Sequence, residues 1–370
     1  MKKPLVPKRD NIHFTTQKAD SYDKQDNFFI TTRGMGKSDA LWGKVYRKWK
    51  NEHKPGINVR TIQADLTESY FDDIETILNK FRPIDDYCTI DYKKGSIKSG
   101  VVDVLIKDNN KMEFELLTRV VALGIPVTRF KSLMIRNPSG IYYDEFIPNT
   151  RIGEKWLPKC AWRLKELYST FARECDGYVL KRYFFGNPYT RFNPYLFEYH
   201  RVDTLKMMPG DFLVGDDYVV DLQKPKEELR ELLKKQNPDL LNSIDKEWQD
   251  FASGEFVNDT NYIIDPVQPQ GFSLRWIFRL QGHNIGCFRA GDDFYLNDVG
   301  ATWFVKLIDD YDGSKKIYAA DFDNLIDGSK LIMSSDKIKL QILKQSIATR
   351  KVVFADTNAA FMVEMLYQLL

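Results

Sequence analysis

A glycine-rich segment near the start of the chain has the residues and spacing needed to bind phosphate. It follows the apolar run 28–30 and precedes a segment in which Leu41, Val45 and Trp49 recur at helical spacing. Small residues between a strand and a helix let backbone amides surround phosphate oxygens. The residues expected around the phosphates are Thr32, Arg33, Gly34, Met35, Gly36, Lys37, Ser38 and Asp39.

Two side chains of this segment have specific expected roles. Lys37 should bridge the β- and γ-phosphates of ATP, and the Ser38 hydroxyl should ligate Mg²⁺. The motif G-x-x-x-x-G-K-[ST] begins with glycine, whereas this chain has Thr31 there. The flanking strand and helix patterns nevertheless favour a P-loop over a β–α turn that binds nothing.

A second segment supplies the acidic residues that ATP hydrolysis needs. Apolar residues 141–143 predict a core strand, and Asp144 and Glu145 follow at the sheet edge where a P-loop also lies. Asp144 should contact Mg²⁺, and Glu145 should act as the general base that orients the attacking water. The acidic pair is typical of a motor-type ATPase, because a small-molecule kinase needs no hydrolytic glutamate. The gap between the two motifs leaves room for an additional strand.

The pattern of apolar runs predicts an α/β protein made of three parts. Residues 1–222 alternate strands with helices, which is typical of a mainly parallel sheet, and include a hairpin of 101–106 with 111–120. Residues 223–260 are charged and helical in pattern, and form the expected linker subdomain. Residues 261–370 are dense in strands and end in two helices, which fits a ribonuclease H-like domain.

Four stretches read together resemble the DNA encapsidation ATPases of small short-tailed phages with protein-primed genomes, ring motors related to terminase large subunits. They are T-T-R-G-M-G-K-S, Y-Y-D-E-F-I, F-A-R and G-N-P-Y-T-R-F-N-P-Y. The resemblance implies a P-loop ATPase domain of the additional-strand, catalytic-glutamate type, a short linker and a ribonuclease H-like domain without nuclease activity. It also implies movement of double-stranded DNA into a procapsid by a homomeric ring, typically a pentamer, on the portal.

The resemblance assigns expected roles to further residues. Arg173 matches the arginine finger that reaches the ATP of the neighbouring subunit, with Arg163 as the alternative. Asn187 matches the polar residue that senses the γ-phosphate, and Arg33 contacts phosphate in its own or the adjacent subunit. Tyr22 either stacks on adenine or packs in the core.

Partners beyond ATP and Mg²⁺ follow from the same resemblance. Arg129 and Lys131 lie where the family has basic residues facing the pore or the next subunit, so they are the expected DNA contacts. The C-terminal domain is expected to dock on the procapsid portal, and in some relatives it binds a structural RNA. The implied location is the host cytoplasm, with transient attachment at the portal vertex and no place in the mature virion.

The expected first strand of the C-terminal domain argues against DNA cleavage. A ribonuclease H-type nuclease needs a carboxylate there to hold two Mg²⁺ ions, and residues 272–280 (FSLRWIFRL) contain none. Two alternatives remain beside a motor without nuclease activity: a terminase-like motor with an active nuclease, and a nucleotide-binding scaffold that does not hydrolyse ATP. Thr31 in place of glycine favours the scaffold.

Composition excludes several classes of protein. Apolar runs such as 120–127 are far shorter than the roughly 18–20 residues of a membrane span. The charged N-terminus has no apolar region behind it, so it does not predict a secretory signal. Four cysteines without a C-x-x-C pair and four histidines without H-E-x-x-H predict neither a disulfide framework nor structural zinc.

Overall fold

The structure is a computed structural model whose described residues form two compact units. The first unit draws on residues 14–190 and 207–236, and the second on 193–202 and 263–369. The structure describes residues 14–80, 87–108, 113–149, 154–190, 193–202, 207–236, 263–280, 282–291, 298, 300–309, 315–320 and 322–369.

The first unit is built on a sheet whose described strands follow the order β3-β4-β5-β2-β6-β7-β1-β9-β8. Strands β5, β2, β6, β7, β1 and β9 run parallel, whereas β3, β4 and β8 pair antiparallel with their neighbours. Their bounds are Asp26–Ile30 (β1), Gly56–Arg60 (β2), Cys88–Tyr92 (β3), Val101–Asp108 (β4), Glu115–Ala122 (β5), Ile141–Asp144 (β6), Arg182–Gly186 (β7), Phe212–Val214 (β8) and Tyr218–Leu222 (β9).

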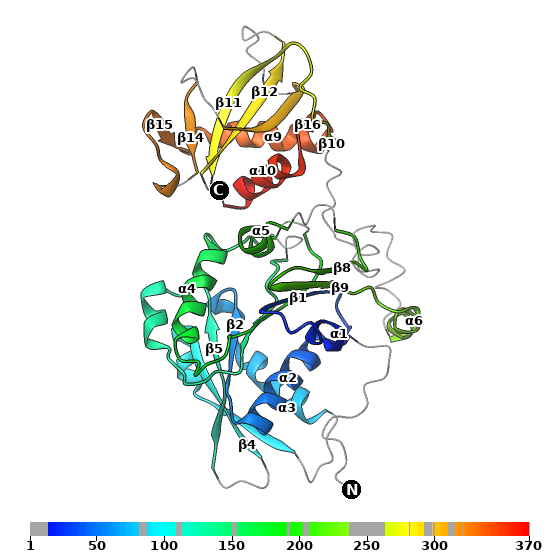
Figure 1. Ribbon diagram of the computed structural model, residues 1–370, viewed down its shortest axis with the longest axis vertical. Helices are drawn as coiled ribbons and strands as arrows, with labels where there is room; N and C mark the ends of the chain where they lie inside the picture. The colour runs from blue at the N-terminus through cyan, green and yellow to red at the C-terminus, as the bar shows by residue number, and fades with distance from the viewer. Residues whose placement is uncertain are drawn as a thin grey trace. The chain divides into compact units, whose positions relative to one another are not determined.

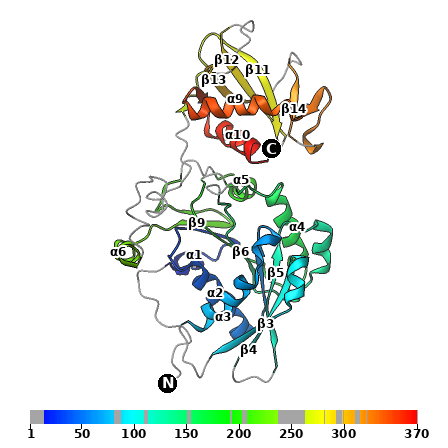
Figure 2. The same ribbon diagram turned by 180° about the vertical axis from the view of Figure 1, so that it is seen from behind.

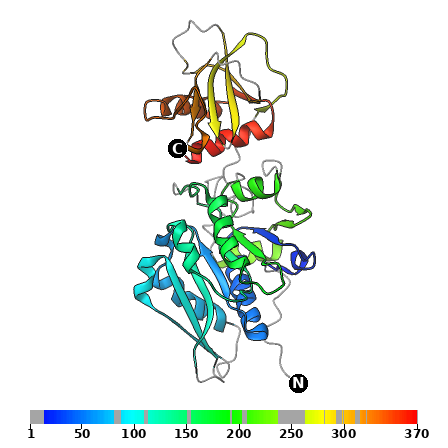
Figure 3. The ribbon, with the colours of Figure 1, turned by 60° about the vertical axis from the view of Figure 1, so that its left-hand side comes forward.

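Helices cover both faces of this sheet, as a parallel core requires. Helices α2 (Lys37–Glu52) and α3 (Glu68–Asn79) pack side by side on one face (Figures 1 and 2), and α4 (Cys160–Ala172) covers the other (Figure 3). The remaining described α-helices of this unit are α1 (Gln17–Asp20) and α6 (Glu227–Gln236). Its short 3-10 helices include η1 (Gln63–Asp65), η3 (Lys94–Ser99) and η4 (Val127–Ser132).

The sequence patterns on both sides of the P-loop are confirmed. The apolar run 28–30 lies within β1, and Phe28 stacks on Phe184 of β7 with 4.2 Å between ring centroids. Leu41, Val45 and Trp49 are buried along one side of α2. The predicted hairpin is also confirmed, because β4 pairs antiparallel with β5.

A buried ion pair joins the starts of β1 and β7. Arg182 donates from Nε and Nη2 to the two carboxylate oxygens of Asp26, each at 2.6 Å. The side chains are 9% and 0% exposed, so the bidentate geometry has to offset a large desolvation cost. The pair therefore holds the two strands in register at the edge where they begin.

The second unit contains a mixed sheet whose described strands follow the order β10-β16-β13-β12-β11-β14-β15. Strands β13, β12 and β11 are antiparallel, and the others add parallel on either side. Helices α9 (Lys337–Ala348) and α10 (Thr357–Leu369) lie on the same face of the sheet (Figure 2). The other bounds are Pro194–His200 (α5), Ile263–Ile264 (β10), Phe272–Leu280 (β11), His283–Ala290 (β12), Trp303–Ile308 (β13), Ile317–Ala319 (β14), Ser329–Leu331 (β15) and Val352–Phe354 (β16).

Two expectations concern the chain as a whole. The division into 1–222, 223–260 and 261–370 stays a prediction, because residues 237–262 lie outside the described part. Within the described part, no helix is both long enough and apolar enough to cross a bilayer.

Gly186 ends β7 against the aromatic core, where a side chain has no room. A Cβ atom on Gly186 would lie 2.7 Å from Cε1 of Phe146, whose ring is buried. We expect Gly186→Ala to lower the free energy of unfolding by about 1–3 kcal/mol, because overpacking forces core side chains to shift. Gly95→Ala is the matched control, since nothing lies within 4 Å of a Cβ there. Equal effects of the two substitutions in denaturant unfolding would contradict this account.

Candidate active site

Three neighbouring parallel strands bring the predicted ATP-site residues to one edge of the first sheet. Because β6, β7 and β1 are adjacent and parallel, their carboxyl ends lie together. Asp144 ends β6, Asn187 follows β7, and the P-loop follows β1. The edge thus assembles the site from segments that are far apart in the sequence.

The P-loop adopts a backbone that its glycines permit. Gly34 and Gly36 have φ values of 78° and 88°, in a region open chiefly to glycine, and α2 begins directly afterwards. Thr31, which stands where the motif has glycine, is buried and donates from its hydroxyl to Gln223 O at 2.6 Å. The threonine therefore ties the loop to the segment that follows β9.

The Lys37 ammonium is folded back onto the loop. Its Nζ donates to Thr31 O at 2.6 Å, to Thr32 O at 2.7 Å and to Asn187 Oδ1 at 2.8 Å. Burial lowers the pKa of Lys37 to about 7, although two nearby carboxylates act in the opposite direction. Its oxygen partners are all neutral, so a phosphate oxygen would be a stronger acceptor.

Arg60, which the sequence analysis did not single out, holds both predicted acids. It ends β2, the neighbour of β6, and donates from Nη1 to Asp144 Oδ2 at 3.0 Å and from Nη2 to Glu145 Oε2 at 2.6 Å. Burial raises the pKa of Asp144, and Arg60 opposes that rise. Its carbon Cζ lies 5.1 Å from the centroid of the Tyr70 ring, a cation–π distance. The one sequence signal was an arginine at the end of an apolar run.

Glu145 differs from Asp144 in backbone and in exposure. Its φ of 52° is in the left-handed region, which costs a residue with a side chain on the order of 1–3 kcal/mol. Its side chain is 49% exposed, whereas that of Asp144 is 11% exposed. Glu145 also lines a cavity of about 200 Å³ together with Arg33 and Tyr189. The buried acid and the solvent-facing acid are thus held by the same guanidinium.

The remaining P-loop residues have varied surroundings. Ser38 is exposed on the first turn of α2, so its hydroxyl is accessible to a ligand. Asp39 pairs with Lys80 at 3.1 Å. Thr32 and Met35 are buried, so their side chains are not on the outer surface of the loop.

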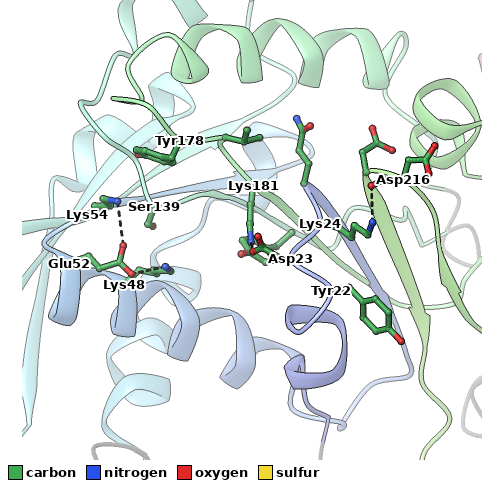
Figure 4. Close-up of a pocket in the computed structure, with 14 residues that line it drawn as sticks. Tyr22, Asp23, Lys24, Lys48, Glu52, Lys54, Ser139, Tyr178, Lys181 and Asp216 are labelled. Atoms are coloured by element: carbon green, nitrogen blue, oxygen red, sulfur yellow. Dashed lines mark hydrogen bonds and ion pairs between the residues drawn. The ribbon is translucent and has the colours of Figure 1, made fainter.

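The structure does not bring Tyr22 together with the P-loop. Helix α1 and the turn after it lead the chain to the opposite edge of the sheet before β1 begins, so Tyr22 precedes the strand that the P-loop follows. Its ring packs on Phe212 with 5.5 Å between centroids. It lines a cavity of about 740 Å³ among charged side chains, including the Lys181–Asp23 pair, at the amino ends of the strands (Figure 4).

Arg163 is engaged within its own chain. It lies in the first turn of α4, where its Nε donates to Leu123 O at 2.9 Å and its Nη2 donates to Ile125 O at 2.6 Å. Both carbonyls belong to the turn that follows β5. The guanidinium therefore fixes this turn against α4.

Arg173 lies at the other end of α4 and is exposed. Its Nε donates to Ser169 O at 3.0 Å, in its own helix. The next residue, Glu174, accepts a backbone hydrogen bond from Asn137, which precedes β6. Arg173 is thus at the amino edge of the sheet, away from the P-loop of its own chain.

The two predicted DNA contacts lie on η4, which follows β5. Arg129 donates from Nη1 to Ser99 O at 2.8 Å, and Lys131 is exposed. Strands β2, β6 and β7 separate β5 from β1 in the sheet. Arg129 and Lys131 are therefore at the same edge as the P-loop but well away from it.

Comparison with known proteins identifies the fold. No protein-family model matches the chain, and no curated protein matches it. The structure is similar to that of the Phi-28 gp11 DNA packaging motor, with a TM-score of 0.65, 15% identity, and 97% of this chain and 98% of that chain covered. It is also similar to a chain of the bacteriophage Phi-29 viral genome packaging motor assembly, with a TM-score of 0.60, 19% identity and coverages of 97% and 100%. The expected likeness to phage packaging motors is confirmed at the level of the fold.

Removal of Arg60 should destabilise the protein because it leaves the carboxylate of Asp144 buried without a paired cation. We expect Arg60→Met to lower the free energy of unfolding by about 3–5 kcal/mol, because buried Asp144 loses its cation. The same substitution should cost less in an Asp144→Asn background, where no buried charge is left unpaired. Denaturant unfolding of the four proteins measures this coupling, and purely additive losses would argue against it.

Proposed function

We propose that this chain is an ATPase that drives double-stranded viral DNA into a procapsid, as one subunit of a homo-oligomeric ring. The observation that carries the proposal is the meeting of Lys37, Asp144, Glu145 and Asn187 at one sheet edge. The likeness in fold to the Phi-28 and Phi-29 packaging motors supports DNA packaging as the work that hydrolysis drives.

ATP binds with its phosphates at the start of α2. Backbone amides of the P-loop and the positive end of the helix dipole favour an anion there. Lys37 exchanges neutral oxygen partners for phosphate oxygens, which releases the Asn187 amide from its present contact. Asn187 can then turn toward the γ-phosphate, as a sensor of the bound triphosphate.

The oxygen donors fit a Mg²⁺ ion that arrives with the nucleotide. Ser38 offers an accessible hydroxyl, and Asp144 offers a buried carboxylate of which Arg60 contacts one oxygen. Oxygen ligands of this kind, completed by water and phosphate, are those that Mg²⁺ prefers. When bound, the ion would neutralise negative charge on the β- and γ-phosphates.

Glu145 orients the attacking water. Its half-exposed carboxylate borders a small cavity, so a water molecule can reach it. The single hydrogen bond from Arg60 Nη2 fixes its direction and leaves its other oxygen without that contact. Hydrolysis thus uses the exposed acid, while the buried acid serves the metal.

The arginine finger acts in trans. Arg163 is held by two backbone carbonyls, whereas Arg173 is exposed at the sheet edge opposite its own P-loop. An arginine at that edge serves a neighbour if subunits associate head to tail, and such interfaces form rings when the rotation between subunits closes. We take the ring to be a pentamer on the portal, because the sequence resembles the DNA encapsidation ATPases of small short-tailed phages.

The second unit is a ribonuclease H-like domain without nuclease activity. The order β13-β12-β11-β14-β15, with three antiparallel strands and two further parallel ones, supports this fold. Its central strand β11 contains Arg275 and Arg279 but no carboxylate, so a two-metal nuclease site lacks its first ligand. This domain docks on the portal in the host cytoplasm, and a structural RNA is a further candidate partner.

The alternative of a nucleotide-binding scaffold loses its main support. It rested on Thr31 in place of glycine, and the Thr31 hydroxyl instead anchors the P-loop to Gln223. The loop keeps its two positive-φ glycines, Gly34 and Gly36, in spite of the substitution.

ATP hydrolysis with and without long double-stranded DNA tests the proposal. We expect DNA to stimulate turnover by the native chain. Glu145→Gln should remove turnover, because the amide cannot accept the water proton, yet it should retain ATP binding. Lys37→Ala should lose both, because the phosphates lose their cation. Turnover by Glu145→Gln at the native rate would eliminate the catalytic assignment.

Mixed rings test the finger in trans. Arg173→Ala and Glu145→Gln subunits should each be inactive alone, with losses on the order of 10³–10⁵ for the finger. Mixing them should restore part of the activity, because some interfaces pair an intact Glu145 with a neighbour's intact Arg173. Arg163→Ala serves as the comparison, and the absence of rescue at every mixing ratio would refute the role of Arg173.

A further inference from the structure

Two short helices at the β4–β5 end of the first sheet gather positive charge. Helix η3 lies between β3 and β4, η4 follows β5, and the hydrogen bond from Arg129 Nη1 to Ser99 O joins them. Close packing reinforces the join, since a Cβ on Gly100 would lie 2.4 Å from the Ile125 side chain. We call this the η3–η4 surface, and its cations are Lys93, Lys94, Lys98, Arg129 and Lys131.

The charge on this surface is largely uncompensated. Lys94 pairs with Glu68 of α3 at 2.5 Å. Lys93 and Lys98 are exposed, and neither has an ion-pair partner among the residues that the structure describes. Clustered cations without acidic partners attract an anionic polymer, and their ammonium groups recognise charge rather than sequence.

The η3–η4 surface is joined directly to the end of β2, where Arg60 contacts both catalytic acids. Gln63 Nε2 donates to Lys98 O at 2.7 Å, which ties η3 to the segment after β2. On the η4 side, Leu123 N donates to Arg60 O at 2.8 Å. A force applied to η3 or η4 is therefore transmitted to residues 60–63. Arg60, the first residue of this segment, contacts both Asp144 and Glu145.

We propose that Lys93 and Lys98 hold the phosphate backbone of double-stranded DNA, and that Arg129 is a positioning residue that keeps η3 in place. This placement rests on the proposed function. It differs from the sequence expectation, in which Arg129 touched DNA itself, because its guanidinium is engaged with the η3 backbone. Phosphate contacts suit a translocating protein, since they are the same at every base pair.

The salt dependence of DNA binding tests the placement. Each phosphate contact contributes a slope of about 0.9 to the plot of log K against log salt concentration. For the full chain and a blunt DNA duplex, Lys93→Ala/Lys98→Ala should lower the slope by about 1.8. Lys165→Ala, at an exposed lysine of α4, is the matched control and should keep the native slope. Lys93→Arg/Lys98→Arg should also keep it, because the charges remain.

A further variant separates positioning from contact. Arg129→Lys keeps the charge but loses the guanidinium nitrogen that donates to Ser99 O, so it should weaken DNA binding several-fold while leaving the slope unchanged. Native affinity in Arg129→Lys would overturn its positioning role.

Each other outcome is also decisive. A native slope in Lys93→Ala/Lys98→Ala, with melting temperature unchanged, would overturn the placement while the proposed function stands. A native chain without affinity for duplex DNA at low salt would remove the proposed function and the placement together. If Lys93→Ala/Lys98→Ala lowered the slope for duplex RNA but not for duplex DNA, the choice of DNA as partner would be overturned.

Discussion

Charge compensation around the buried carboxylate of Asp144 is the constraint on which this site depends. Two cations, Lys37 and Arg60, lie near the two acids Asp144 and Glu145. Arg60 satisfies both acids at contact distance, whereas Lys37 donates to neutral oxygens and has a pKa that burial lowers. The proposed magnesium–nucleotide complex would bring charge of both signs, so the cations and acids could exchange partners without leaving an unpaired charge in the interior.

The order of the strands in the sheet places these charged residues next to one another. β2 carries Arg60, β6 carries Asp144, β7 leads to Asn187, and β1 leads to the P-loop, in the order β2-β6-β7-β1. At the opposite edge the buried Asp26–Arg182 pair joins β1 to β7. The short strand β1 is thus fixed at its start by an ion pair and at its end by the Lys37–Asn187 contact. A shift of one strand relative to the other would break both.

The parts of this arrangement that could be predicted from sequence are those encoded within one segment. The P-loop, the strand before it, the buried face of α2 and the acidic strand end each have a local pattern, and the hairpin of β4 and β5 does too. Arg60 has no such pattern, because its role comes from the pairing of β2 with β6 across a long stretch of chain. The position of Tyr22 also could not be predicted from the sequence. A helix of four residues, Gln17–Asp20, carries the chain to the other sheet edge and is too short to leave a periodic signal.

The backbone at Glu145 has a consequence for how this chain can change over time. A residue with a side chain is held at a φ of 52°, at a position where its carboxylate borders the small cavity. Glycine or asparagine would adopt that conformation more readily, so the fold alone would select against glutamate there. Under the proposed function, stability and activity thus oppose each other at this glutamate, and a lineage that no longer needed ATP hydrolysis would be free to lose it and fold better.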